Sequence, residues 1–451
     1  MGAGPRDVGL LLPPSRSADL ALMIAPVADR RTISARSAAV VGLASVLSAL
    51  SGYLILVIAA RTLGPARNAD FLVYWALLFG MYGIVGGLQQ ETTRSVGSAD
   101  LRPVPTQRAV HVLPVGLLVG IGAAVVVGAS SPVWSEQFLG PGSWPLVVCL
   151  CGAVTAYGGY SAIVGALNGQ RSWHAAAALI SAEGTVRLLL VALVAVAGAR
   201  KLGLEVAISA AAAVWLVFLL VSPTGRRAAR ATGDGDVRQF LNGTGHAMVG
   251  TASSAVLVVG FPVLLRLTST NLEWVTAAPL LLAISLTRAP LLLPLQAYQG
   301  VAIAHFLSER ERGIMVLFGP AAAVMGVGAI GAAGAYLFGP FIMSAFFGPE
   351  YHVDGRLLAG LTLAAVCLAL LTLTGSAVLA AGRHRAYAVG WFLSSFASVA
   401  LLMVDLPLAL RAVLSLCLGP LLGIGIHLAA NSVSRSLPTY ERATNRAGGS
   451  H

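Results

Sequence analysis

The sequence predicts an all-α polytopic membrane protein, with about twelve transmembrane helices in two six-helix bundles related by pseudo-twofold symmetry. Three observations predict this class. Long apolar runs follow one another with only short polar joints between them, and similar motifs recur in the two halves. Hydrophobic residues make up 57% of the 451 residues and charged residues only 10%, whereas a soluble chain carries about a quarter of its residues charged. Because the runs are continuous and not alternating, they indicate helices rather than a β-barrel.

Each run is long enough to cross a bilayer. A hydrocarbon core about 30 Å thick needs about 20 apolar residues, and only helices and closed barrels satisfy their backbone within it. We therefore expect spans at residues 37–60, 71–88, 109–129, 144–167, 174–197, 204–221, 248–267, 275–301, 314–337, 357–381, 386–404 and 412–430.

These spans divide the chain into five segments. Two terminal tails are polar and flank the spans, and the first is expected to be disordered. The longest joint is polar and basic and separates the two halves. The segments are residues 1–36 (N-terminal tail), 37–221 (N-terminal bundle), 222–247 (linker), 248–430 (C-terminal bundle) and 431–451 (C-terminal tail).

The basic residues predict the orientation. Joints on the side of the termini carry 18 Lys and Arg residues, and the opposite joints carry 7. Because positive charge accumulates in cytoplasmic loops, we expect both termini in the cytoplasm and the protein in the inner (cytoplasmic) membrane. The net charge of +11 is then a topological signal, and no nucleic-acid partner is expected.

The two halves share short motifs in the same order. Phe138-Leu139-Gly140-Pro141 matches Phe346-Phe347-Gly348-Pro349, and the joint at Gly169 to Arg171 resembles the joint at Gly382 to Arg385. A duplicated unit of six helices is the parallel-repeat arrangement, in which a substrate binds between the halves near the middle of the membrane.

Nothing in the sequence indicates an enzyme. The four cysteines lie inside apolar runs without disulfide or metal spacing, so no metal or cofactor is expected. The outer joints are too short to fold into a catalytic domain. We therefore expect a transporter that works through its helices.

Charged residues inside the spans are the first functional candidates, because they are costly in a membrane. Glu183 and Arg187 lie midway along the fifth span at i,i+4 spacing. One interpretation is a structural ion pair. The other is an ion-coupling carboxylate, Glu183, that responds to protons or sodium beside a phosphate-binding guanidinium, Arg187.

Arg288 is the strongest candidate for substrate binding. No acidic residue lies within a helical turn of it, and Pro290 and Pro294 follow and are expected to bend the helix. We expect Arg288 to face the cavity, where its planar fork suits phosphate oxygens. The alternative is a structural pair with a carboxylate such as Glu183.

Polar residues also gather at the ends of two spans. Gln89, Glu91 and Arg94 follow the second span, and Gln296 and Gln299 close the eighth. They are candidate substrate-binding residues at the cytoplasmic mouth, where they would bind sugar hydroxyls. Solvated helix ends are the alternative.

At this point the chain resembles a known family. Arg61-Thr62-Leu63-Gly64-Pro65 is similar to the R-x-L-G-P that opens the first outer loop of Wzx-like polysaccharide flippases, and the stretch from Phe346 to Tyr351 is similar to another element of these proteins. They belong to the multidrug/oligosaccharidyl-lipid/polysaccharide (MOP) exporter superfamily. The resemblance covers about residues 35 to 430. It implies two six-helix bundles around a central cavity, alternating access, and movement of a polyprenyl-linked saccharide to the outer leaflet.

Three functions remain open on the sequence. The first is a flippase for a polyprenyl-(pyro)phosphate-linked saccharide in the lipid bilayer, with glycan-assembly enzymes as candidate partners. The second is a MATE-like drug or cation antiporter, whose site is expected to be acidic and aromatic. The third is a polyprenyl-dependent membrane glycosyltransferase, which needs an acidic residue in an outer loop. The central charges are two arginines and one glutamate, which favours an anionic headgroup.

Overall fold

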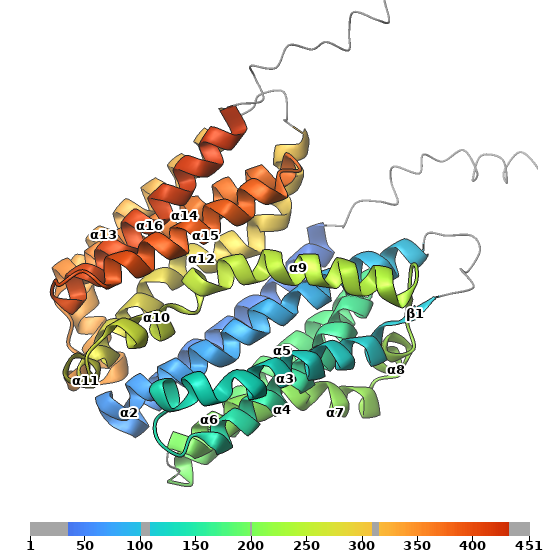
Figure 1. Cartoon of the computed structure of the whole chain (residues 1–451), viewed down its shortest axis with the longest axis horizontal. Helices are drawn as coiled ribbons and strands as arrows, with labels where there is room; N and C mark the ends of the chain where they lie inside the picture. The colour runs from blue at the N-terminus through green and yellow to red at the C-terminus, as the bar shows by residue number, and fades with distance from the viewer. Residues whose placement is uncertain (1–34, 101–108, 199–200, 309–314, 433–451) are drawn as a thin grey trace, which may run out of the picture.

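The computed structural model describes residues 35–100, 109–198, 201–308 and 315–432, and it is almost entirely helical (Figure 1). Within the described residues, nine helices are long and apolar enough to cross a membrane, or ten when one bent pair counts as a span. The longest of them contains the first two predicted runs, and a further helix, Ala277–Ser308, contains most of the eighth. The ends of the described chain, Ala35 and Ser432, lie on the same side of the molecule (Figure 1), as an even number of spans requires. We call this the terminal side, and the side that carries Gly64 and α11 the distal side.

The first two spans form one long element, α2, which is broken at Gly64. This residue has φ 69° and ψ 168°, outside the helical region, and Pro65 begins the second span. Proline suits the first turn of a helix because the amide hydrogen that it lacks has no helical partner there. The elements of the N-terminal half are α2 (Ala35–Asp100), α3 (Val112–Leu139), α4 (Trp144–Gly169), α5 (Trp173–Val196), α6 (Lys201–Ala210), η2 (Ala211–Ala213) and α7 (Val214–Val221).

The C-terminal half begins with an interrupted span. The sequence predicts one continuous helix at residues 248–267, and this is wrong: α9 ends at Val258, α10 begins at Phe261, and their axes are bent by 59°. By contrast, α12 runs as one helix through Pro290 and Pro294. The elements of this half are α9 (Val237–Val258), α10 (Phe261–Thr268), α11 (Asn271–Val275), α12 (Ala277–Ser308), α13 (Phe318–Phe347), η4 (Pro349–Tyr351), α14 (Gly355–Ala380), α15 (His384–Leu402) and α16 (Leu408–Ser432).

The segment between the halves contains regular structure. A short helix, α8 (Pro223–Ala229), is followed by β2 (Thr232–Gly233), which pairs antiparallel with β1 (Val110–His111). Asp234 N donates to Ser95 O at 3.1 Å. The segment is therefore strapped to the terminal side of the N-terminal half, and α9 begins within the residues predicted as a linker.

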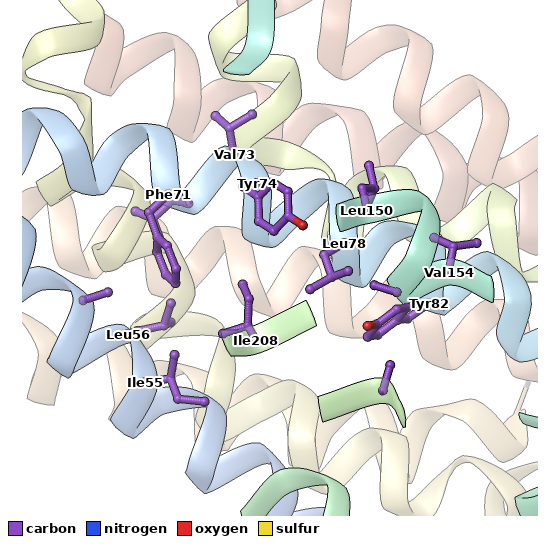
Figure 2. Packing of buried hydrophobic residues seen from close by; sticks show 14 of the residues in the cluster. Ile55, Leu56, Phe71, Val73, Tyr74, Leu78, Tyr82, Leu150, Val154 and Ile208 are labelled. Carbon is purple, nitrogen blue, oxygen red and sulfur yellow. The ribbon is translucent and has the colours of Figure 1, made fainter. Parts of the chain in front are cut away.

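One helix lies at the centre of each half. In α4 and α14, 61% of the residues in the apolar stretch are buried, against 11% in α13. Large side chains of α2, including Phe71, Tyr74 and Tyr82, pack against Val154 of α4 and Ile208 of α6 in the core of the N-terminal half (Figure 2). Helices α3 and α4 approach each other closely at Gly158, where an added Cβ would lie only 2.6 Å from Gly116 O. Small residues permit such close packing of helix backbones.

The motifs of the two halves have matching conformations. Helix α3 ends at Gly140 with φ 90°, and α13 ends at Gly348 with φ 122°. The later joints also match, but Gly382 (φ 75°) corresponds to Arg171 (φ 58°) and not to Gly169. Arg171 therefore adopts the left-handed conformation that glycine provides at the other joint.

The outer surface is apolar. Large hydrophobic side chains are exposed on helices of both halves, among them Val126 of α3, Leu193 of α5, Phe341 of α13 and Phe392 of α15. An aqueous surface does not carry such a continuous belt. The protein is therefore a multi-pass membrane protein, and these side chains face lipid.

Candidate functional site

A cavity of about 430 Å³ lies between the two halves. Helices α2 and α5 form one wall, and the other wall consists of α12 and the junction of α9 with α10. None of its lining residues is acidic. Its polar lining consists of Ser45, Ser48, Tyr53, Arg187, Ser285 and Arg288. Two of the three arginines predicted as substrate-binding residues, Arg187 and Arg288, thus line the same cavity from opposite halves.

Arg187 is held firmly on the wall of the N-terminal half. Its Nη2 lies 3.2 Å from Glu183 Oε2 and 3.3 Å from Ser48 Oγ, and its guanidinium lies 4.8 Å from the centre of the Phe79 ring. Both members of the pair are buried. Glu183 neutralises Arg187, and it is not among the residues that line the cavity. Whether Glu183 also couples transport to an ion stays a prediction.

Aromatic rings surround this pair. Trp75 packs against Phe79 with ring centres 4.3 Å apart and a tilt of 33° between the rings, and both line the cavity. Tyr82 and Tyr157 stack at 3.9 Å inside the N-terminal half. Of these rings, Trp75 and Phe79 are the ones that a molecule in the cavity would meet.

Arg288 has different partners from those expected. Its Nη1 donates to Leu257 O at 3.1 Å and to Val258 O at 3.3 Å, and the guanidinium lies 5.5 Å from the centre of the Phe261 ring. It is buried and lines the cavity. The alternative of a pair with Glu183 is not seen, because Glu183 binds Arg187. Among the described residues, no carboxylate forms an ion pair with Arg288, and its described partners are two backbone carbonyl groups and the Phe261 ring.

The described polar groups predicted at the cytoplasmic mouth are not among the residues that line this cavity. Glu91 is buried, bonds Arg94 Nε at 2.8 Å, and packs against Gly243 of α9. Gln89, Glu91 and Arg94 are not among the residues lining the cavity, so contact with a substrate there stays a prediction. Gln296 and Gln299 lie in α12, but their side chains fall outside the part of the structure that is described.

The distal side is closed by bonds between the halves. Arg61 Nε donates to Phe346 O at 2.9 Å, and Tyr351 Oη donates to Ala60 O at 3.2 Å. Burial raises the pKa of Tyr351 to about 12, so its hydroxyl remains a donor at neutral pH. The two motifs that carry the family resemblance therefore contact each other across the halves.

Two comparisons address the identity of the chain through its sequence. No protein-family model matches it. The uncharacterized protein Rv3630 of Mycobacterium tuberculosis H37Rv is 42% identical over 399 residues, which cover 88% of this chain and 92% of the relative. The uncharacterized protein Rv1510 of the same strain is 40% identical over 415 residues, covering 92% and 96%. The chain belongs to this mycobacterial family.

Solved structures identify the fold of this family. An outward-facing multidrug resistance MATE transporter of the MOP superfamily has a TM-score of 0.64 at 12% identity, covering 90% of this chain and 97% of its own. A MOP superfamily transporter from Pyrococcus furiosus also scores 0.64, at 13% identity and 89% and 96% coverage. The eukaryotic MATE transporter AtDTX14 scores 0.63, at 15% identity and 91% and 97% coverage. This chain therefore has the fold of these transporters, and the predicted fold class of twelve helices in two bundles is confirmed.

Sequence reasoning missed two features of this MOP-fold protein. The break in span seven, which provides the partners of Arg288, is signalled by Gly260 and Pro262 inside an apolar run. Glu205 in α6 is 1% exposed, and neither of its carboxylate oxygens has a hydrogen-bond partner within the described residues. In the sequence, Glu205 can be recognised as a single acidic residue inside the sixth predicted span, one helical turn after Lys201.

Proposed function

We propose that the protein is a membrane exporter that moves a polyprenyl-linked saccharide across the cytoplasmic membrane by alternating access, and that Arg288 binds the phosphate group of this substrate. The observation that carries the proposal is the buried charge of Arg288 in a cavity between the halves, without a carboxylate partner among the described residues. A buried guanidinium in this state attracts an anion, and its fork matches phosphate oxygens.

The rest of the lining supports an amphipathic headgroup. Hydroxyl groups of Ser45, Ser48 and Ser285 line the cavity and can bond sugar hydroxyls, and the Trp75 ring offers a flat apolar face. In the MOP superfamily transporter from Pyrococcus furiosus, reverse polarity of the binding pocket suggests a different function for that protein. Pocket polarity therefore differs among transporters of this fold, which supports reading the polarity of this cavity from its own residues.

The conformation supports a direction of loading. If the 18-to-7 bias places the terminal side in the cytoplasm, the bonds of Arg61 and Tyr351 close the external side. The cavity in this state would accept substrate from the cytoplasmic leaflet.

The proposal is tested by transport in proteoliposomes, with a fluorescent polyprenyl-pyrophosphate-linked sugar and a membrane-impermeant quencher. The Arg288→Ala variant should abolish movement of the label, and Arg288→Lys should restore it in part, because a point charge loses the bidentate geometry. The matched control is Arg266→Ala, because Arg266 of α10 lies over the ring of Trp274 in α11 and does not line the cavity. Full transport by the Arg288→Ala variant, at a normal protein level, would contradict the proposal that Arg288 binds the phosphate group of the substrate.

The drug or cation antiporter is the competing outcome of the same experiment. Ethidium loaded into the same vesicles tests it. Efflux of ethidium by the wild type, with no movement of the lipid-linked sugar, would replace the proposed function with cation export.

A further inference from the structure

The broken span leaves backbone carbonyl groups without helical donors. In a continuous helix, Leu257 O would accept from the amide of Phe261, and Val258 O from the amide of residue 262. The chain turns before these bonds form, and Pro262 has no amide hydrogen to give. The end of α9 therefore presents two acceptors and the negative end of its dipole.

Arg288 occupies this end. It donates to both carbonyl groups, at 3.1 and 3.3 Å, and its guanidinium lies over the ring of Phe261 at the start of α10. A residue of α12 thus caps the break in span seven. The same guanidinium lines the cavity between the halves.

The cap joins a helix at the interface of the two halves to the rest of the C-terminal half. Helix α9 packs on the second span of α2, where Thr251 Oγ1 donates to Ile84 O at 3.1 Å and Gly87 lies against the backbone of Met248. Arg288 belongs to α12, which packs against α14 in the C-terminal half. Releasing Arg288 from α9 would therefore loosen the connection of this interface helix to its own half.

We propose that an anion in the cavity competes with the end of α9 for Arg288, so that binding removes the cap and span seven straightens. This inference rests on the proposed function, because it uses the same anion site. The uncapped Leu257 O can regain a partner by accepting from the Phe261 amide, as in a continuous helix. Phosphate oxygens carry full charge and compete well with neutral carbonyl groups for a guanidinium.

The bend can be followed by distance. Spin labels at Val249→Cys on α9 and Leu267→Cys on α10 occupy exposed positions, in a background in which the four native cysteines are replaced. Helix α10 is 8 residues long, so complete straightening through 59° would move its far end by about 12 Å and lengthen the distance between the two labelled positions by about 3–4 Å, at a rise of about 1.5 Å per residue. Inorganic pyrophosphate and farnesyl pyrophosphate serve as probes, which separates a free anion from a lipid headgroup.

Either probe that binds should lengthen the distance in the wild type. The Arg288→Met variant should show the longer distance without a probe and should not respond to one. Arg266→Met is the control, because Arg266 also belongs to the bent pair and also lies over a ring, that of Trp274. This variant should behave as the wild type. An Arg288→Met variant with the short distance of the unliganded wild type would overturn the capping role.

Affinity provides a second measurement. Pro262→Ala restores an amide that can bond Val258 O, so the cap competes less with the anion. Calorimetric titration should show probe binding about fivefold tighter in this variant, which corresponds to about one hydrogen bond. Unchanged affinity would contradict the competition.

The outcomes separate the two proposals. Binding that depends on Arg288 without a change in distance would overturn the coupling and leave the proposed function standing. Absence of binding by both probes, in the wild type and in Pro262→Ala, would overturn the anion site and the coupling together.

Discussion

The buried pair of Glu183 and Arg187 should behave as a strongly coupled unit. Its atoms are 3.2 Å apart and both side chains are less than a tenth exposed. At an effective dielectric constant of about 20, two unit charges at this separation attract by about 5 kcal/mol. Removing one partner leaves the other charge buried, which costs about 3–5 kcal/mol. We therefore expect Glu183→Gln and Arg187→Gln each to lower the free energy of unfolding by that amount.

The double variant leaves no net charge in the helix, so it should be more stable than either single variant. The expected coupling energy is about 3 kcal/mol, measured by reversible unfolding in mixed SDS micelles. The matched control is the pair of Asp70 and Lys201, whose atoms are 3.3 Å apart but whose side chains are 39% and 23% exposed. Its cycle should give about 0–1 kcal/mol.

Equal coupling energies for the buried and the exposed pair would refute this reasoning, because burial would then have no effect. Transport separates the two interpretations of Glu183. If the pair is structural, the double variant should transport better than either single variant. If Glu183 is the coupling site, the double variant should fold and lose its dependence on the ion gradient.

Three further predictions concern packing, pH and topology. Gly158→Ala should lower stability by about 1–3 kcal/mol because its Cβ meets backbone of α3, whereas Gly152→Ala on the same helix has open space; equal thermal stabilities would contradict this. The amide of Thr270 holds the pKa of Glu273 below its ordinary value of 4.5, so its stabilising contribution is present above that pH and is lost as the pH falls through the lowered pKa. The melting temperature of Glu273→Gln should therefore fall less than that of the wild type on acidification, and parallel curves would argue against it. A reporter fused after Ala430 should be active only as a cytoplasmic fusion, and external activity would reverse the assigned orientation.

The spans were predictable because hydropathy is a local property of the chain. The break after Val258 was missed although Gly260 and Pro262 signal it, because the run around them stays apolar and hydropathy alone predicts one continuous span. Conversely, Pro290 and Pro294 look like a kink in the sequence, yet α12 continues through them. A proline marks a lost hydrogen bond, and the neighbouring helices decide whether the chain breaks there.

The site was predictable only in part. A charged residue in a span is visible in the sequence, so Arg187 and Arg288 could be named. Their partners are of two kinds. The partner of Arg187 lies one turn away and follows from helix geometry, whereas the carbonyl groups bound by Arg288 lie on another helix and exist only because that helix is broken.

The seal on the distal side has a consequence for the divergence of this family. Arg61 and Tyr351 both donate to main-chain oxygens of the opposite half. A main-chain acceptor is present whatever side chain its residue carries, so the acceptor positions are free to vary while the donors are retained. Paired substitutions between the halves are therefore not expected at these contacts, and residue covariation among relatives would underestimate how tightly the two bundles are joined.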